Sequence, residues 1–486
     1  MSSSHILLIS LILPVVGAIA ISLVGKKPNL REAVTMITAT VLFYCVLTLS
    51  GDVLLGERPS LFLFEILPGL PIAFRIEPLG TVFSLVASGL WVINSLYSVG
   101  YMRGNNENKQ TRFYVCFALA IAAALAIAFA ANLLTLFLFY ELLTLVTYPL
   151  VTHAGTDKAR QGGRIYLAIL MGSSVLFLLP ALIYIWFQTG STEFVPGGIL
   201  PTSMGEFERI LLLMLCMFGL GKAALMPIHR WLPAAMVAPT PVSALLHAVA
   251  VVKAGVFSVV KLIIYIFGLN FLDDITGLLI FVSCFTIVAA SLVALDADNL
   301  KRRLAYSTVS QLSYVVLGVA LLAPLSVAAA IIHIVAHALG KITLFFAAGS
   351  IYTAAHKTEV SQLDGIGLRM PLTMTAFAIG SLSMIGLPPA AGFVSKWYLV
   401  SGAYAEAAWL PLTVILFSTL LNAAYLLPVV YRAFFRPLSP ADMDNQHGEA
   451  PWPIVAAMII TSLATIWFFF IPDPLIKLAI QTMENI

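Results

Sequence analysis

The residues best suited to chemistry are ionisable side chains set inside long apolar segments. Glu141 lies within the apolar segment 133–152, and it is the only carboxylate in the middle of any predicted membrane span. Placing such a group in a membrane costs about 2.5–3.5 kcal/mol on insertion scales, so buried charges of this kind usually mark an ion or proton path. Glu141 therefore predicts a transport role and not a purely structural one.

Lysines accompany this carboxylate inside the predicted spans. Lys222 comes shortly before Pro227, and Lys396 follows Pro388 and Pro389. Proline removes a backbone donor and breaks the helix, so freed carbonyls and water can solvate an ammonium group beside it. The full set of lysines inside spans is Lys222, Lys253, Lys261, Lys341 and Lys396.

Histidines add groups that titrate near neutral pH. His333, His337 and Lys341 are spaced four residues apart, which places them close to one helical face over about 12 Å of membrane depth. His247 precedes Lys253 by six residues, about 120° around a regular helix.

The chemistry that these groups permit is stepwise proton transfer. Glu141 and Lys222 would form a couple in which a nearby carboxylate favours the charged lysine and burial disfavours it. A charge arriving from a neighbour could then release or capture a proton, and the histidines could link the steps. Structural pairing is the alternative, but one acid cannot neutralise four lysines. Lys261, near the end of its span, is expected to snorkel to the membrane interface.

Composition defines the class of protein. The 486 residues are 60% hydrophobic and 10% charged, with mean hydropathy +0.99, which predicts an all-α polytopic membrane protein. The four cysteines lie in spans without CxxC spacing, so neither a disulfide framework nor a metal site is expected. We find no soluble nucleotide or hydrolase motif and no matched histidine pairs for haem, so we expect no cofactor and no enzyme activity in the chain alone.

Hydrophobic windows predict about fourteen spans, the first of them a retained span and not a cleaved signal. The seventh and twelfth are long and interrupted by prolines, so both should be broken helices that line a polar interior. The predicted spans are 5–24, 31–50, 78–100, 113–131, 133–152, 163–187, 208–236, 240–267, 273–295, 303–323, 326–352, 371–401, 407–433 and 452–475.

The loops between these spans alternate in charge. Seventeen lysines and arginines fall on one side and four on the other, which by the positive-inside rule places both termini on the non-cytoplasmic side. The four are Arg58, Arg75, Arg209 and Lys477.

The broken spans also predict an internal repeat. Each is the fourth of five spans in the blocks 4–8 and 9–13, and a five-span block followed by its copy must be inverted relative to it. We expect N-terminal spans in 1–105, a first repeat in 106–270, a second, inverted repeat in 271–436 and a C-terminal span in 437–486.

Five stretches resemble a known family of membrane subunits. They are FYELLTLVTYPLV, GKAALMPIHRWLPAAMVAPTPVSALLHAVAVVKAG, KRRLAYSTVSQLSYVVLG, HIVAHALGKITLFFAAGSI and SMIGLPPAAGFVSKWYL. Their order and content are similar to the antiporter-like subunits of respiratory complex I, membrane-bound hydrogenases and Mrp multisubunit cation/proton antiporters. Within that family the chain most resembles the D-type subunit of Mrp antiporters.

The resemblance implies roles for matching residues. Glu141 and Lys222 would be the ion pair, Lys253 the central lysine and Lys396 the terminal proton site. His333, His337 and Lys341 would be the link along the eleventh span. A similar complex I subunit has glutamate where Lys396 stands, so the lysine favours the D-type Mrp subunit, although another complex I member and some hydrogenase subunits share it.

Two functions follow as hypotheses. The first is a proton-translocating subunit of a monovalent cation/proton antiporter, with Na⁺ as the expected cation, in a hetero-oligomeric complex of the bacterial inner membrane. The second is the proton-pumping membrane arm of a redox enzyme. A passive scaffold is the third and weakest reading. The sequence shows no cation site of carboxylates and carbonyls.

Overall fold

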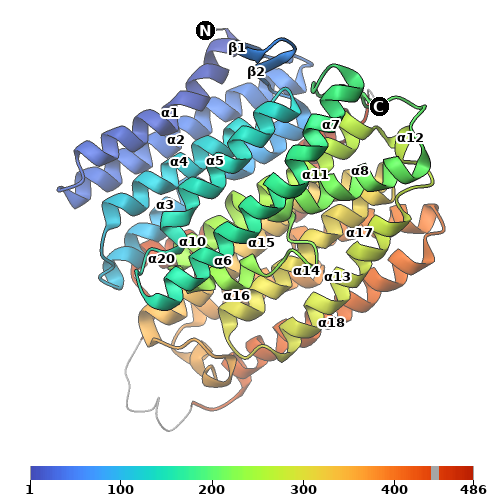
Figure 1. Ribbon diagram of the computed structural model, residues 1–486. Coiled ribbons are helices and arrows are strands. Elements are labelled where there is room, and N and C mark those ends of the chain that lie inside the picture. Colours follow the sequence, from blue (N-terminus) through green and yellow to red (C-terminus); the bar gives the residue numbers. More distant parts are fainter. Residues whose placement is uncertain (1, 439–447, 485–486) are drawn as a thin grey trace.

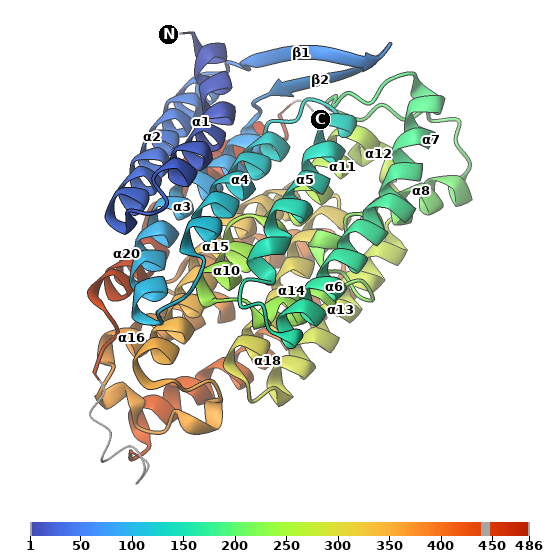
Figure 2. The ribbon, with the colours of Figure 1, turned by 60° about the vertical axis from the view of Figure 1, so that its left-hand side comes forward.

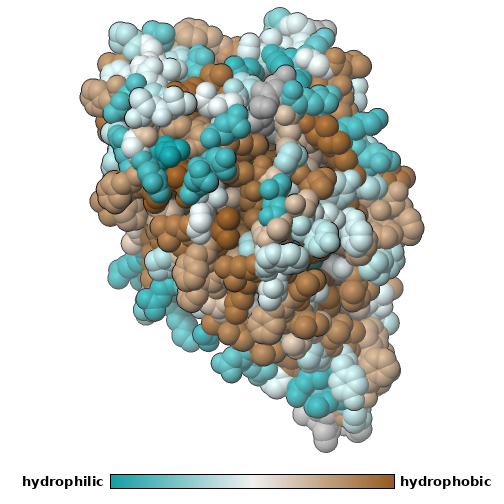
Figure 3. Space-filling view, turned by 90° about the vertical axis from the view of Figure 1, so that its right-hand side faces the viewer, coloured by the Kyte–Doolittle hydropathy of each residue, from teal (hydrophilic) through white to brown (hydrophobic). Residues whose placement is uncertain are grey.

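The computed structural model describes residues 2–438 and 448–484, which form one bundle of packed helices (Figure 1). Helices α1 and α2 lie at one edge of the bundle, and α13 and α18 lie toward the other. Hydrophobic side chains predominate in the middle of the face shown in Figure 3. This distribution fits a bundle whose sides face lipid.

The N-terminal part contains three long helices and a β-hairpin that we did not predict. The elements are α1 (Ser3–Leu23), α2 (Pro28–Leu54), β1 (Ser60–Leu67), β2 (Leu70–Arg75) and α3 (Pro78–Gly104). The two strands pair antiparallel, and the alternate residues Leu70, Ile72 and Phe74 of β2 are buried. Figure 2 shows the hairpin across one end of the bundle, where α1 begins and α21 also lies.

The middle of the chain carries more irregular helices. The elements are α4 (Gln110–Ala128), α5 (Leu133–Val151), α6 (Asp157–Ser173), η1 (Ser174–Leu178), α7 (Leu179–Thr189), α8 (Glu206–Gly219), η2 (Gly221–Ala223), α9 (Trp231–Ala234), η3 (Ala235–Val237), α10 (Thr240–Ala244), η4 (Leu245–Val249), α11 (Val251–Leu262), η5 (Ile263–Phe267) and α12 (Leu269–Leu272). The side chain of Asn132 caps α5 by accepting a hydrogen bond from the backbone N–H of Thr135.

The C-terminal part again consists mainly of long helices, and one of its membrane-length segments is interrupted after Ile385. The elements are α13 (Gly277–Asp296), α14 (Leu300–Ala320), α15 (Pro324–Ala355), η6 (Val360–Gln362), η7 (Ile366–Leu368), α16 (Pro371–Ile385), α17 (Ala391–Ala405), α18 (Trp409–Phe435), α20 (Trp452–Phe470) and α21 (Asp473–Gln481). Proline occupies the first turn of several of these helices, where its missing N–H costs no helical hydrogen bond.

The helices coincide with the predicted spans. Within the described residues, eleven helices or helical runs are long and apolar enough to cross a membrane. The three remaining predicted spans are α14 and the two interrupted segments. That all fourteen segments cross the membrane, and that they form inverted repeats, stays a prediction.

The interruptions lie where prolines predicted them, and a third occurs where we expected a regular helix. The seventh segment breaks after Gly219, and the twelfth breaks between Ile385 and Ala391. The eighth contains a π-helical turn, η4, followed by Ala250 at φ −122° and ψ −65°. The sequence carries no proline or glycine at this turn, so local propensity gave no signal for it.

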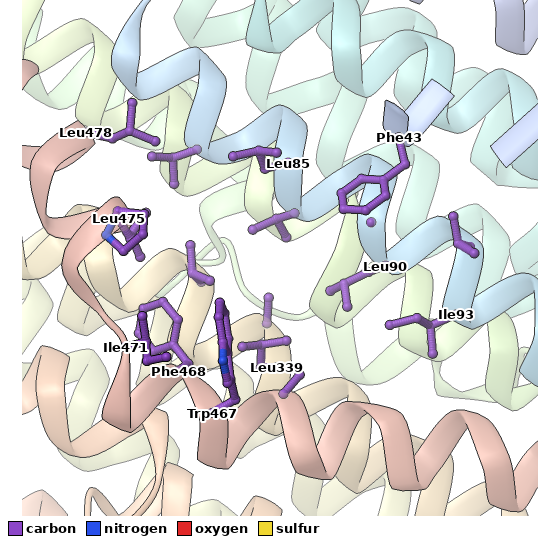
Figure 4. Close-up of a pocket in the computed structure, with 18 residues that line it drawn as sticks. Phe43, Leu85, Leu90, Ile93, Leu339, Trp467, Phe468, Ile471, Leu475 and Leu478 are labelled. Atoms are coloured by element: carbon purple, nitrogen blue, oxygen red, sulfur yellow. The ribbon is translucent and has the colours of Figure 1, made fainter. Parts of the chain in front are cut away.

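The interrupted eighth segment and α15 form the core of the bundle. Every residue in the most apolar window of Thr240–Phe267 is buried, and so is 89% of the corresponding window of α15. On one side of α15, the apolar residues Val335, Ala338 and Leu339 line a pocket of about 420 Å³ with α3 and α20 (Figure 4). The ionisable side chains of α15 contact helices other than α3 and α20.

Candidate proton-translocation site

Lys222 lies in the break between α8 and the rest of the seventh segment. Its side chain is fully buried, and Nζ donates a hydrogen bond of 2.8 Å to the backbone carbonyl of Tyr140 in α5. The ammonium group also stands 3.3 Å from the centre of the Tyr140 ring. The Tyr140 hydroxyl in turn accepts a hydrogen bond from the Lys222 backbone N–H. This one tyrosine therefore holds both the backbone and the side chain of the lysine.

The break comes very close to the core helix α11. A Cβ atom added to Gly255 would lie 2.3 Å from the carbonyl carbon of Lys222 and 2.3 Å from the backbone nitrogen of Ala223. Both neighbours are backbone atoms, which cannot rotate away as a side chain can. Glycine at position 255 therefore allows the Lys222 turn to pack against the helix that carries Lys253.

Glu141 follows Tyr140 and lies near Lys222 without pairing with it directly. Both carboxylate oxygens are buried, and neither makes a hydrogen bond with a described residue. Its negative charge still acts on the Lys222 ammonium group. The predicted couple is therefore electrostatic in this structure, whereas the hydrogen bond from Lys222 goes to Tyr140.

Lys253 and His337 are in direct contact between α11 and α15. The Lys253 Nζ atom lies 2.6 Å from Nδ1 of His337, and both side chains are buried. A charged lysine can donate its proton to a neutral imidazole at this distance. The other ring nitrogen of His337 has no hydrogen-bond partner among the described residues, so it is available to a further donor or acceptor.

His333 extends this contact toward α17. Its ring centre lies 6.1 Å from that of His337, one turn away on α15. Its Nδ1 atom lies 2.8 Å from the hydroxyl oxygen of Ser395, the residue before Lys396. The predicted histidine pair therefore connects the central lysine to the twelfth segment.

Lys341 belongs to a separate hydrogen-bonded group with α14 and α18. Its Nζ atom donates a 2.7 Å hydrogen bond to the hydroxyl of Ser307. The Tyr425 hydroxyl lies 2.9 Å from the same Ser307 oxygen and also contacts the side-chain oxygen of Asn422. The Asn422 amide then donates to the backbone carbonyl of Met384. This route runs from α15 to the end of α16.

Lys396 caps the broken twelfth segment. Its Nζ atom donates hydrogen bonds of 3.0 and 2.9 Å to the carbonyls of Met384 and Ile385 at the C-terminal end of α16. These carbonyls carry the negative end of the helix dipole, which favours a cation. Gly386 follows at φ +89°, and a Cβ atom there would lie 2.5 Å from Cδ of Lys396. The contacts from His333 end at Ser395, the residue before Lys396. The contacts from Lys341 end at Met384, whose carbonyl Lys396 also contacts.

His247 is buried but isolated from this network. Neither ring nitrogen makes a hydrogen bond with a described residue, and the ring centre lies 4.6 Å from that of Phe345, with the two rings tilted by 39°. The π-helical turn η4 and the break at Ala250 separate it from Lys253. The predicted 120° relation between His247 and Lys253 therefore does not describe the structure, because it assumed a regular helix.

Lys261 corrects another prediction. We expected it to snorkel to the interface, but its side chain is fully buried. Its Nζ atom donates to the carbonyl of Ala130 at 2.7 Å and lies 3.4 Å from a carboxylate oxygen of Glu77. Glu77 precedes the first turn of α3 and was placed outside the spans by hydropathy. Its partner lies in a distant segment, so local patterning gave no signal for the pair.

Several polar residues of the network escaped the sequence analysis because each is ordinary in its own helix. They are Ser307, Ser395, Tyr140, Asn422 and Tyr425, which are neutral, and such residues commonly bond their own backbone. A stripe of polar residues along 307–314 of α14 was the one available signal.

Fold and site together define a multi-pass membrane protein that keeps a chain of ionisable side chains in its interior. The family described as NADH:quinone oxidoreductase/Mrp antiporter, transmembrane, matches residues 130–422, and the chain belongs to this family. The resemblance noted in the sequence is thereby confirmed at the level of the family.

Both quinone oxidoreductase subunits and cation/proton antiporter subunits are similar to the chain. NADH-quinone oxidoreductase subunit N of Desulforudis audaxviator is 32% identical over 457 residues, which cover 93% of this chain and 90% of that protein. The A/B subunit of a probable K⁺/H⁺ antiporter from Rhizobium meliloti is 32% identical over 414 residues, which cover 83% of this chain but only 40% of that longer protein.

Solved structures share the whole fold. A chain of the Mrp complex from Dietzia sp. DQ12-45-1b matches with a TM-score of 0.87 at 20% identity, covering 100% of this chain and 98% of that one. A chain of the archaeal membrane-bound sulfane sulfur reductase matches with a TM-score of 0.87 at 23% identity and the same coverage. At these identities the matches establish the fold and not the activity.

Proposed function

We propose that the chain is the proton-translocating subunit of a multisubunit monovalent cation/proton antiporter of the Mrp type, corresponding to its D-type member. The proton gradient drives the exchange, and Na⁺ is the cation. The lysine at position 396 and the antiporter relatives support this assignment. The subunit itself has no catalytic centre and requires no cofactor; it works with other membrane subunits of a hetero-oligomeric complex.

The observation that carries the proposal is the series of buried titratable groups between two helix breaks. Lys222 lies at the first break and Lys396 at the second. Lys253, His337 and His333 lie between them and are joined to each other or to Ser395 by the contacts described above. Protons move along this series, while the charge on Glu141 sets whether Lys222 holds its proton.

A redox-driven proton pump is the second candidate, and one observation favours it. The quinone oxidoreductase subunit N relative matches almost end to end, with 93% and 90% of the two chains covered. In that case the free energy comes from electron transfer in partner subunits, and the same buried groups carry the proton.

The placement in the membrane forms part of the proposal. The subunit lies in a bacterial inner membrane with both termini on the non-cytoplasmic side, as the bias of lysine and arginine indicates. Residues 106–270 and 271–436 each supply a half-channel as inverted repeats. Impermeant labelling of single cysteines at Lys27 and Lys477, two exposed positions, tests the orientation, because these positions should label from opposite sides.

The deciding experiment uses everted vesicles that contain the whole complex and a fluorescent ΔpH probe. An unrelated pump establishes the gradient, and NaCl or KCl is then added without any electron donor for the complex. We expect salt to collapse ΔpH in the wild type and not in Lys396→Ala, with Lys26→Ala as the exposed control. Proton movement that needs reductant and ignores salt would instead identify the redox pump.

A further inference from the structure

A second buried ionic cluster lies at the hairpin end of the bundle, outside the series described above. Lys261 is fully buried, and besides Ala130 and Glu77 it faces the rings of Phe194 at 4.6 Å and Phe257 at 5.6 Å. Burying an ammonium group in this way costs free energy unless a group of opposite charge lies beside it. Glu77 is that partner, at 3.4 Å.

Glu77 connects this lysine to the outside of the bundle. Its other carboxylate oxygen accepts a 3.0 Å hydrogen bond from Nε of Arg75, whose guanidinium also donates to the carbonyl of Phe194. Glu77 and Arg75 line an open pocket of about 360 Å³ that Arg58 and Gln481 also border. The carboxylate therefore lies between an aqueous pocket and a buried lysine.

The hairpin fixes this arrangement. The backbone N–H of Arg75 donates to the carbonyl of Phe129, and that of Ala131 donates to the carbonyl of Ala73. Strand β2 is thereby joined to the α4–α5 connection that supplies the Ala130 carbonyl to Lys261. The hairpin covers this end of the bundle (Figure 2). It thus helps to position Arg75 and Glu77 beside Lys261.

The lysine is also placed on the same helix as the central lysine of the network. Lys253 and Lys261 both lie in α11, eight residues apart, which corresponds to about 12 Å along the axis. Ser258 lies between them in the sequence, about 60° around the helix from Lys261 and about 140° from Lys253. It is fully buried, and its hydroxyl makes no hydrogen bond with a described residue.

We propose that Glu77 and Lys261 form a proton-exchange site that connects the interior around Lys253 to the aqueous pocket at the hairpin end. A proton from the pocket is taken up by the Glu77 carboxylate and passes to a neutral Lys261 amine. Lys261 then releases a proton toward Lys253, and Glu77 is left as a carboxylate. The reverse sequence releases protons to the pocket. This inference rests on the proposed function only in that the subunit moves protons.

The alternative is an ion pair that serves only to hold α3 against α11. A double variant, Glu77→Gln with Lys261→Met, separates the two roles, because removing both charges together leaves no unpaired buried ion. Lys261→Arg is the complementary variant, since arginine keeps the charge and the pair but does not release a proton at these pH values. Lys477→Arg, an exposed position at the same end, is the matched control.

The experiment measures proton movement per assembled complex in vesicles, once with salt and once with reductant as the driver. We expect both test variants to lose proton movement by about tenfold or more, as for loss of a proton-transfer group, while the control matches the wild type. Wild-type proton movement in either assembled test variant would overturn the inference. If the wild type responds to reductant and not to salt, the antiporter assignment fails, and the same comparison still decides this site.

Discussion

The Nζ atom of Lys253 lies 2.6 Å from Nδ1 of His337, across the interface between α11 and α15. These residues belong to the two halves that we propose as inverted repeats, so this contact joins one half-channel to the other. It is also a contact between two bases, and no described carboxylate pairs with either of them: Glu141 acts on Lys222 through its charge, and Glu77 pairs with Lys261. Such a pair is poor as a structural link and well suited to passing a proton.

Replacing Lys253 with methionine should separate function from stability. Proton movement should fall by about a hundredfold or more, because a positioned proton-transfer group is lost. The assembled complex should keep its thermal unfolding midpoint or show a higher one, because a buried amine without an acidic partner is removed. Vesicle ΔpH assays and thermal unfolding in detergent measure the two effects.

The exposed change Lys26→Met is the control for Lys253→Met and should leave both quantities unchanged. A Lys253→Met protein that still moves protons at the wild-type rate would show that the contact with His337 lies off the path.

Much of this arrangement was predictable because membranes simplify the relation between sequence and structure. Long apolar segments must be helices, and the prolines at 227 and 388 favour breaks in their spans. Pro14, Pro149 and Pro428, by contrast, lie inside unbroken helices. The pattern therefore indicated the lysines beside those breaks. The hairpin β1–β2, the turn at 245–249 and the partner of Lys261 were not predictable, because each depends on contacts between distant segments.

Tyr425 provides a test of the route from Lys341 to Lys396. Its hydroxyl joins Ser307 and Asn422, and the Asn422 amide reaches the Met384 carbonyl that Lys396 also contacts. Tyr425→Phe keeps the ring and removes only the hydroxyl, so we expect assembly to be normal and proton movement to fall by about tenfold.

Tyr431→Phe on the same helix is the matched control, because Tyr431 is exposed. If Tyr425→Phe and this control behave alike, protons reach Lys396 through His333 and Ser395 alone.

Gly255 tests the close packing of the Lys222 turn. Gly255→Ala would place a methyl group 2.3 Å from the Lys222 backbone, which must move or strain the helix. We expect a loss of about 1–3 kcal/mol in stability, as for overpacking of a core, together with impaired proton movement. Thermal unfolding and the vesicle assay report both.

Gly172→Ala is the corresponding control in α6, because a Cβ atom there meets nothing within 4 Å. It should be neutral or slightly stabilising, since alanine favours a helix. Equal behaviour of the two variants would contradict the packing that we describe.

His153, in the connection after α5, predicts a pH dependence of stability. Burial, with help from the positive charges of Arg112 and Lys109, lowers the pKa of its imidazole to about 4. The unfolded chain binds a proton at this residue near pH 6.5, so acidification between about 6.5 and 4 favours unfolding, and the stability gained above pH 6.5 is lost. Glu107, 3.8 Å away, acts with the opposite sign because burial raises its pKa.

The difference between the wild type and His153→Gln isolates the histidine, because Glu107 is common to both proteins. We expect the thermal unfolding midpoint of the wild type to fall more steeply below pH 6.5 than that of His153→Gln. His356→Asn changes an exposed histidine at a left-handed backbone position that asparagine tolerates, and it should leave the pH profile as in the wild type. Parallel profiles for the wild type and His153→Gln would mean that the imidazole is not held neutral in the folded protein.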